Sequence, residues 1–332
     1  MGLGHATRSL VVVDALRREG VQVQLFSGGK AAEFMRGVGE QVEDIVDDPV
    51  PSVANGEMRR VALWYLRSWT AYRRSIRRTE RLFEKFAPDL VVCDEEFTGV
   101  SLAQRRGMKR VFMSDELELG FARTWIARAI ERRVERWYVS LQESVSLLLI
   151  PGYGEDIGNR RHIGPIVRPI TLAPEDVRRK YGLPPGRFAL FSMSGSGIGR
   201  ELASNVANLT KEGALGGAFL AITGNRGPKI RGPGVYDLGL VDDNQDLVAC
   251  SDLVISTAGK STIDEAAASG VPIITIPIKY HAEQERNASE LGYSAADSER
   301  LGALIKEKMG KRTSPKSFSG GSAACAAIMS LL

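Results

Sequence analysis

Small and hydroxyl-bearing residues gather at positions 256–262, where they can bind an anion. The apolar run Leu253–Ile255 precedes them and predicts a buried strand, while the helical pattern after them ends at Gly270, just before Pro272. A loop between a parallel strand and a helix presents backbone N–H groups and the positive end of the helix dipole. The pattern therefore predicts a phosphate site at the carboxyl edge of a parallel sheet.

A second glycine loop, 192–197, follows the predicted strand Phe188–Phe191 and opens another helix. Its amides can hold one face of a diphosphate, and the residues expected there are Ser194, Gly195 and Ser196. The alternative is a tight turn that needs glycine for close packing. Two such loops in one half of the chain favour the phosphate site.

The stretch 256–288 is similar to the donor half of nucleotide-sugar glycosyltransferases of the GT-B architecture. It resembles the family 28 branch that contains the peptidoglycan lipid-intermediate N-acetylglucosaminyltransferase. The residues that carry the resemblance are Ser256, Gly259, Glu265-Ala266, Gly270, Pro272, His281, Glu283-Gln284 and Asn287-Ala288.

The resemblance implies a set of residues that bind a UDP-sugar, each with its own part of the donor. Glu265 would accept hydrogen bonds from the ribose. Leu240 and Val241 would contact the uracil edge, and Glu283 and Gln284 would hold the sugar hydroxyls. The residues expected around the diphosphate are Thr257, Gly259, Ser261 and Thr262. Neither a D-x-D pair nor a His/Cys cluster with metal spacing occurs in the sequence, so we expect no metal and no cofactor.

His5 is the predicted catalytic base, because glycosyl transfer needs a group that takes the proton of the acceptor hydroxyl. The alternative is a histidine that caps a helix or contacts phosphate. Asp94 closes the predicted strand 90–93 and is the expected partner of the imidazole, which it would orient. Glu96 is a rival partner, and an exposed strand-end acid is the alternative interpretation of Asp94.

Strands alternate with helical patterns throughout, which predicts an α/β protein with two Rossmann-like, doubly wound domains facing a cleft. We expect residues 1–158 to bind the acceptor and residues 159–332 to bind the nucleotide sugar. A closing helix, 322–332, is expected to pack back toward the first domain. The loop at Gly4-His5 has no strand before it, whereas the resembled family has the central strand there. We expect the first sheet to lack this strand, and Met1 to be a mis-assigned start.

The chain has 332 residues, a net charge of +4 and three cysteines, which is typical of a reduced, cytoplasmic globular protein and not of a dedicated nucleic-acid binder. It shows neither a signal peptide nor an apolar run of transmembrane length. Two arginine-rich stretches with aromatic residues, 59–86 and 121–138, predict basic amphipathic helices. Such helices suit peripheral contact with the inner membrane face or an acidic, lipid-linked acceptor. The alternative is an apolar stripe on the core with a solvated arginine face.

These observations together favour a UDP-sugar-dependent hexosyltransferase of the cell envelope polysaccharide type. It would move a hexose or N-acetylhexosamine to a hydroxyl of a lipid-linked or polysaccharide acceptor. Two alternatives remain: a UDP-sugar 2-epimerase of the same fold, and a nucleotide-sugar-binding protein without catalysis.

Overall fold

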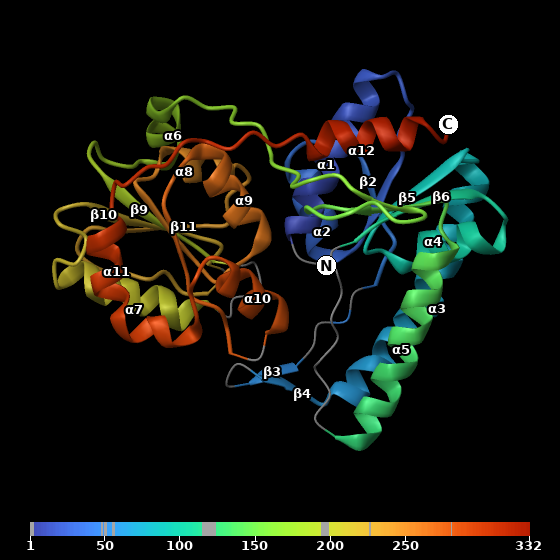
Figure 1. The fold of residues 1–332 in the computed structure, drawn as a ribbon, viewed down its shortest axis with the longest axis horizontal. Helices are drawn as coiled ribbons and strands as arrows, with labels where there is room; N and C mark the ends of the chain where they lie inside the picture. Colours follow the sequence, from blue (N-terminus) through green and yellow to red (C-terminus); the bar gives the residue numbers. More distant parts are fainter. Residues whose placement is uncertain are drawn as a thin grey trace. The chain divides into compact units, whose positions relative to one another are not determined.

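The computed structural model describes residues 3–47, 49, 52–54, 57–114, 124–193, 199–225, 227–279 and 281–332 (Figure 1). The chain forms two compact units. The first comprises residues 3–166 and 319–332, and the second comprises residues 167–318.

The second unit is built on a five-stranded parallel sheet with the strand order β11-β10-β9-β12-β13. Its strands are β9 (Phe188–Ser192), β10 (Phe219–Thr223), β11 (Val235–Gly239), β12 (Leu253–Ser256) and β13 (Ile273–Thr275). Its helices are α6 (Pro174–Tyr181), α7 (Arg200–Lys211), α8 (Asn244–Cys250), α9 (Lys260–Ser269), α10 (Ala282–Glu290) and α11 (Leu301–Lys308), with a 3₁₀ turn, η1, at Ala295–Arg300.

The central strand β9 shows why this sheet is covered on both faces. Ala189 and Phe191 pack into one apolar cluster, while Phe188 and Leu190 pack into another. Successive strand residues point to opposite faces, so a strand that is apolar throughout needs helices on both sides. The loops after the strands then lie together at the carboxyl edge, where the predicted donor loops belong.

The first unit contains two separate parallel sheets and a short antiparallel hairpin. One sheet pairs β1 (Leu25–Ser27) with β2 (Val42–Asp44); the other has the order β5 (Leu90–Asp94), β6 (Lys109–Met113), β7 (Leu147–Ile150), β8 (Arg160–His162). The hairpin joins β3 (Ser52–Ala54) and β4 (Glu57–Arg59). The helices are α1 (Leu3–Arg18), α2 (Gly29–Gly37), α3 (Val61–Phe86), α4 (Phe97–Arg105), α5 (Trp125–Ser144) and α12 (Gly320–Met329).

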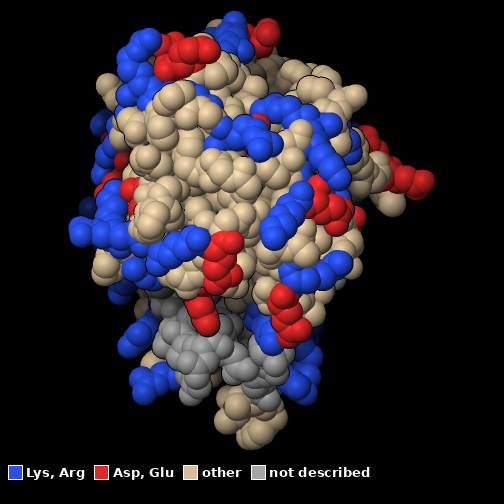
Figure 2. All heavy atoms as spheres, turned by 90° about the vertical axis from the view of Figure 1, so that its left-hand side faces the viewer, with Lys and Arg blue, Asp and Glu red and all other residues tan. Residues whose placement is uncertain are grey.

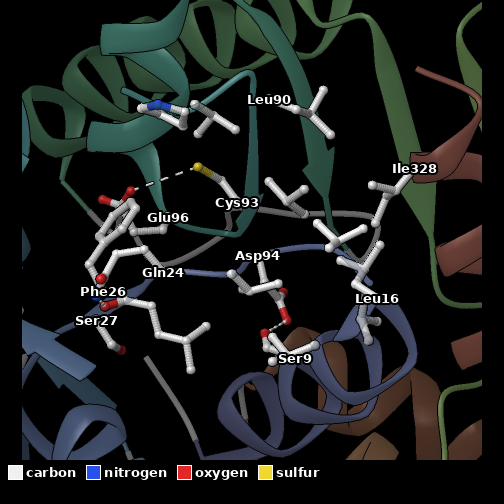
Figure 3. Close-up of a pocket in the computed structure, with 18 of the residues that line it drawn as sticks. Ser9, Leu16, Gln24, Phe26, Ser27, Leu90, Cys93, Asp94, Glu96 and Ile328 are labelled. Carbon is white, nitrogen blue, oxygen red and sulfur yellow. Dashed lines mark hydrogen bonds between the residues drawn. The ribbon is translucent and has the colours of Figure 1, made fainter. Parts of the chain in front are cut away.

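The two sheets of the first unit are separated by a cavity of about 600 Å³. Among the described strands, β1 pairs only with β2, and β5 pairs only with β6, so one edge of each faces the gap. Figure 3 looks into this cavity, with Gln24 and Phe26 on one side and Leu90 and Cys93 on the other. Apolar residues of α1 and α12, such as Leu16 and Ile328, complete the lining. The expected gap in the amino-terminal sheet is therefore confirmed, and it leaves two rows of backbone groups without a neighbouring strand.

The division between the units differs from the boundary expected at residues 158 and 159. Residues 159–166 belong to the first unit because β8 pairs in parallel with β7, through Leu148 and Arg160 among others. The closing helix α12 was expected to pack back toward the first domain. It belongs to the first unit and packs against α1. A Cβ atom on Gly320 would lie 2.4 Å from the carbonyl oxygen of Pro165, so this close approach requires glycine.

Charged side chains are mixed over the face of the molecule seen in Figure 2. Lysine and arginine are interspersed there with aspartate and glutamate. This mixture of signs agrees with the modest net charge of +4.

Candidate active site

The structure brings the two predicted catalytic residues together in the first unit. His5 lies in the first turn of α1, and Asp94 is the last residue of β5. The imidazole Nδ1 is 3.1 Å from Oδ1 of Asp94. The Asp94 side chain is only 7% exposed, so the interpretation as an exposed strand-end acid is wrong.

Two further residues of α1 bind the same carboxylate. Arg8 donates from Nε to both carboxylate oxygens, at 3.1 and 2.9 Å, and Ser9 donates from Oγ to Oδ2 at 2.8 Å. His5, Arg8 and Ser9 are spaced by three and four residues, so they share one face of the helix. Sequence reasoning missed Arg8 and Ser9, although this spacing was the signal that could have found them.

The charges of this cluster set the protonation of its members. Burial alone would raise the pKa of the Asp94 carboxyl, but the Arg8 and His5 charges hold it well below its usual range. Burial alone would lower the pKa of His5, and Arg8 acts in the same direction. Asp94, with a smaller effect of Glu95, outweighs both, so the pKa of His5 is raised above its ordinary value of 6.5. Asp94 therefore stays ionised at neutral pH and favours the imidazolium form of His5.

Glu96, the rival partner of His5, has a different task in the structure. Its carboxylate caps the amino end of α4 and accepts hydrogen bonds from the backbone N–H groups of Thr98 and Gly99, both at 2.7 Å. The side chain is buried, and burial raises the pKa of its carboxyl despite these bonds. Glu96 therefore stabilises the α4 terminus, and Asp94 is the carboxylate next to His5 Nδ1.

The predicted donor loop of the second unit connects β12 to α9. Ala258 has the left-handed backbone angle φ +61°, and Gly259 is the N-cap of α9. Ser261 and Thr262 lie in the first turn of α9, and Thr257 is buried just before it. The loop is fixed from the opposite side by Asn287, whose side-chain amide donates to the Ala258 carbonyl oxygen at 3.0 Å. The other predicted loop residues, Ser194, Gly195 and Ser196, lie outside the described residues.

Glu265 is buried on α9 and is held by a residue that sequence reasoning missed. Arg168 donates from Nε and Nη2 to Oε1 of Glu265, at 3.0 and 2.9 Å, and from Nη1 to the Asp242 carbonyl oxygen at 2.8 Å. Burial raises the pKa of Glu265, although Arg168 opposes this effect. Arg168 belongs to the segment that enters the second unit, far from Glu265 in sequence, so no local pattern indicated the pair.

Asn244 joins Glu265 to the ends of two strands. Its side-chain oxygen accepts a hydrogen bond from Oγ1 of Thr223 at 2.7 Å and faces Oγ of Ser192 at 3.4 Å. The same side chain is hydrogen-bonded to Glu265. Polar groups from β9, β10 and the amino end of α8 therefore meet Glu265 at the carboxyl edge of the sheet.

The remaining predicted donor residues lie on loops and on α10. Leu240 follows β11 and is 51% exposed, next to the partly buried Val241. Glu283 is exposed in the first turn of α10, whereas Gln284 is buried and its amide oxygen accepts the backbone N–H of Ile278 at 3.1 Å. In this arrangement the Gln284 oxygen stabilises the loop between β13 and α10.

Lys260 forms an ion pair with Asp264 within α9, at 2.5 Å.

Within the described parts of the chain, no group of three or more His, Cys, Asp or Glu side chains is arranged to hold a metal ion. No helix in the described ranges is long and apolar enough to cross a bilayer.

Two family models match this chain. The family 28 glycosyltransferase carboxyl-terminal domain matches residues 227–299, and the glycosyl transferase family 1 model matches residues 1–122. The UDP-N-acetylglucosamine--N-acetylmuramyl-(pentapeptide) pyrophosphoryl-undecaprenol N-acetylglucosamine transferase of a Nocardioides species is 27% identical over 309 residues, covering 86% of this chain and 78% of that protein. An uncharacterised glycosyltransferase of Methanosarcina mazei is 26% identical over 322 residues, covering 88% and 82%.

Solved structures show the same architecture. The glycosyltransferase of kitacinnamycin matches with a TM-score of 0.63 and 16% identity, over 99% of this chain and 93% of that one. The spinosyn rhamnosyltransferase complexed with thymidine diphosphate matches with a TM-score of 0.60 and 16% identity, over 99% and 92%. At such identities the structural likeness establishes the fold, and the sequence matches add the activity class. The chain is a GT-B glycosyltransferase that resembles the family 28 branch.

Proposed function

We propose that this glycosyltransferase moves a hexose or N-acetylhexosamine from a UDP-sugar to a hydroxyl of a lipid-linked or polysaccharide acceptor. The observation that carries the proposal is the partly buried contact between His5, at the start of α1, and Asp94. A histidine oriented by an ionised carboxylate can remove the proton of an attacking hydroxyl. The donor is proposed from the substrate named for the Nocardioides relative, UDP-N-acetylglucosamine.

Each group of the cluster would contribute a distinct step. Asp94 would fix the orientation of the imidazole, and Arg8 would balance the negative charge of Asp94. His5 would then receive the proton of the acceptor hydroxyl while the acceptor oxygen bonds to the anomeric carbon. The bond from that carbon to the diphosphate breaks, and the backbone N–H groups around Gly259 would stabilise the leaving group without a bound metal. Glu265 would accept the ribose hydroxyls.

A surface for a lipid-linked acceptor is proposed on α3 and α5, which lie side by side in Figure 1. Tyr65 of α3 donates to Glu131 of α5 at 3.2 Å, which ties the pair together. Trp69 and Trp125 are 59% and 78% exposed, so part of the aromatic stripe lies outside the core. The same helices carry exposed arginines, such as Arg67 and Arg73 on α3 and Arg128 on α5. Exposed aromatic rings and arginines on one pair of helices suit the anionic inner face of a membrane. The enzyme would then be cytoplasmic and bound peripherally.

The test is to follow the donor sugar by NMR with purified protein, with and without a lipid-linked acceptor. Transfer predicts loss of UDP-N-acetylglucosamine only when the acceptor is present. A new UDP-sugar epimer formed without acceptor would instead establish the 2-epimerase. Binding of the UDP-sugar without any turnover would support the other alternative, a nucleotide-sugar-binding protein without catalysis.

Replacing Glu265 by alanine is expected to weaken UDP binding by about 1–3 kcal/mol, because a charge-assisted hydrogen bond to the ribose is lost. Calorimetry with UDP measures this change. Asp264→Ala is the matched control, since Asp264 lies next to Glu265 on α9 but pairs with Lys260. Unchanged UDP affinity in a folded Glu265→Ala protein would remove Glu265 from the donor site.

A further inference from the structure

The second ring nitrogen of His5 faces a second carboxylate, that of Glu95. Nε2 lies 3.4 Å from Oε2 of Glu95, and the two side chains are 22% and 18% exposed. Because Nδ1 contacts Asp94, the imidazole is bracketed by two consecutive acids of the chain.

The backbone holds Glu95 in an unusual conformation to make this contact. Its φ is +48°, in the left-handed region that residues other than glycine, asparagine and aspartate rarely adopt. Two hydrogen bonds keep it there: its N–H donates to the Met113 carbonyl oxygen at 3.0 Å, and Oγ of Ser114 donates to Oε1 at 3.2 Å. The end of β6 and the residue after it therefore aim the Glu95 carboxylate at His5.

The charged groups around the imidazole come from two elements. Helix α1 supplies Arg8, whose Nη2 lies 2.9 Å from Nδ1 of His5 and which also binds Asp94. The end of β5 supplies Asp94, and Glu95 follows directly. Arg8 and Asp94 meet on the Nδ1 side, and among the charged groups of the described residues it is Glu95 that faces Nε2. A separation of 3.4 Å is longer than a normal N–H···O hydrogen bond, and an acceptor hydroxyl can replace this contact at small cost.

We propose that Glu95 is a positioning residue for His5. Its carboxylate holds Nε2 of the imidazole and later receives the proton that His5 removes from the acceptor hydroxyl. The proposal rests on the proposed function of His5. As the acceptor oxygen bonds to the anomeric carbon, the diphosphate leaves with the electron pair of the broken bond, and the hydroxyl proton passes to Nε2. After the product departs, Nε2–H donates to the Glu95 carboxylate, which is exposed enough to release the proton to water.

The test combines an NMR titration of His5 with the pH–rate profile of Glu95→Gln. The chain contains three histidines, so the His5 signal is assigned by its loss in His5→Ala. Removing the neighbouring anion is expected to lower the pKa of His5 by about half a unit or more. The acid limb of kcat should move to lower pH, and kcat at the optimum should fall by about tenfold, while the donor KM stays within about twofold.

Four further variants sharpen the result. Glu95→Asp should restore part of the shift, and Ser114→Ala should give a smaller shift in the same direction. Glu43→Gln removes an exposed acid of β2 and should leave both readouts unchanged. If Glu95→Gln folds poorly, Glu95→Gly removes the carboxylate while fitting the left-handed backbone, with a Tm equal to or above that of the wild type.

A Glu95→Gln protein whose His5 titration and pH profile superimpose on those of the wild type would overturn the proposal. If His5→Ala is inactive in the same experiment, the failure concerns Glu95 alone. Full activity of His5→Ala would show that the assigned base itself is wrong.

Discussion

Replacing His5 by alanine is expected to lower kcat by at least about 10²-fold, because a general base contributes roughly 10²–10⁴-fold to the rate. UDP affinity should stay nearly intact, since the predicted nucleotide-binding residues belong to the second unit and His5 belongs to the first. Steady-state kinetics with saturating donor and calorimetry with UDP separate the two effects. A histidine that only caps α1 would change stability or acceptor KM and leave kcat close to normal.

The wild-type pH profile gives an independent check of the same residue. Asp94 raises the pKa of His5 above 6.5, so the imidazole is protonated over a wider range on the acid side. A protonated base cannot accept the acceptor proton, so the rate should fall as the pH decreases, with its midpoint above pH 6.5. A rate that stays constant from neutral pH to pH 5 would contradict the assignment of His5 as base.

Filling the gap in the first sheet is expected to raise the thermal stability strongly. The change is a five-residue apolar strand and a short glycine link joined before Leu3, because α1 begins at the carboxyl edge where Asp94 ends β5. A parallel strand there would pair with β1 and β5 and cover the apolar lining of the 600 Å³ cavity. At about 1.5–3 kcal/mol per buried large side chain, before the cost of ordering the strand, we expect Tm to rise by about 5 °C or more.

The control for this experiment is an extension of the same length with proline at its second and fourth positions. Proline cannot donate to a sheet ladder, so the control should melt like the unextended chain. Differential scanning calorimetry compares the three proteins. Equal melting temperatures for the apolar and proline extensions would mean that the cavity does not accept a strand.

The sequence was sufficient for the features that depend on local pattern. The apolar run at β12, the small residues after it and the helix stop at Gly270 are adjacent in the chain, and the structure has each of them. The gap in the first sheet was expected from the resemblance, because the resembled family has a strand before this glycine loop, and the described strands β1 and β5 each have a single partner. The position of the boundary between the units could not be read from the sequence, because β8 is short and belongs to the first unit only through its pairing with β7.

The parts of the site that sequence reasoning missed depend on contacts between distant residues. Arg168 reaches Glu265 across 97 positions, and nothing near either residue indicates the pair. Sequence reasoning also missed Glu95, because the direction of its side chain is set by a left-handed backbone angle and by Met113 on another strand. Glu96, the rival partner of His5, caps helix α4 instead. A carboxylate two and three residues before backbone N–H groups can cap a helix, and in the structure the Glu96 side chain accepts from the N–H groups of Thr98 and Gly99.

We propose that this chain joins a sugar from a UDP donor to an acceptor hydroxyl with His5 as the base. Mass spectrometry of a lipid-linked acceptor, after incubation with UDP-N-acetylglucosamine and either wild type or His5→Ala, measures this transfer. The wild type should add one sugar to each modified acceptor and release an equal amount of UDP, while His5→Ala should bind UDP and add almost none. An acceptor left unmodified by the wild type while UDP is released, or modified equally by both proteins, would contradict this proposal.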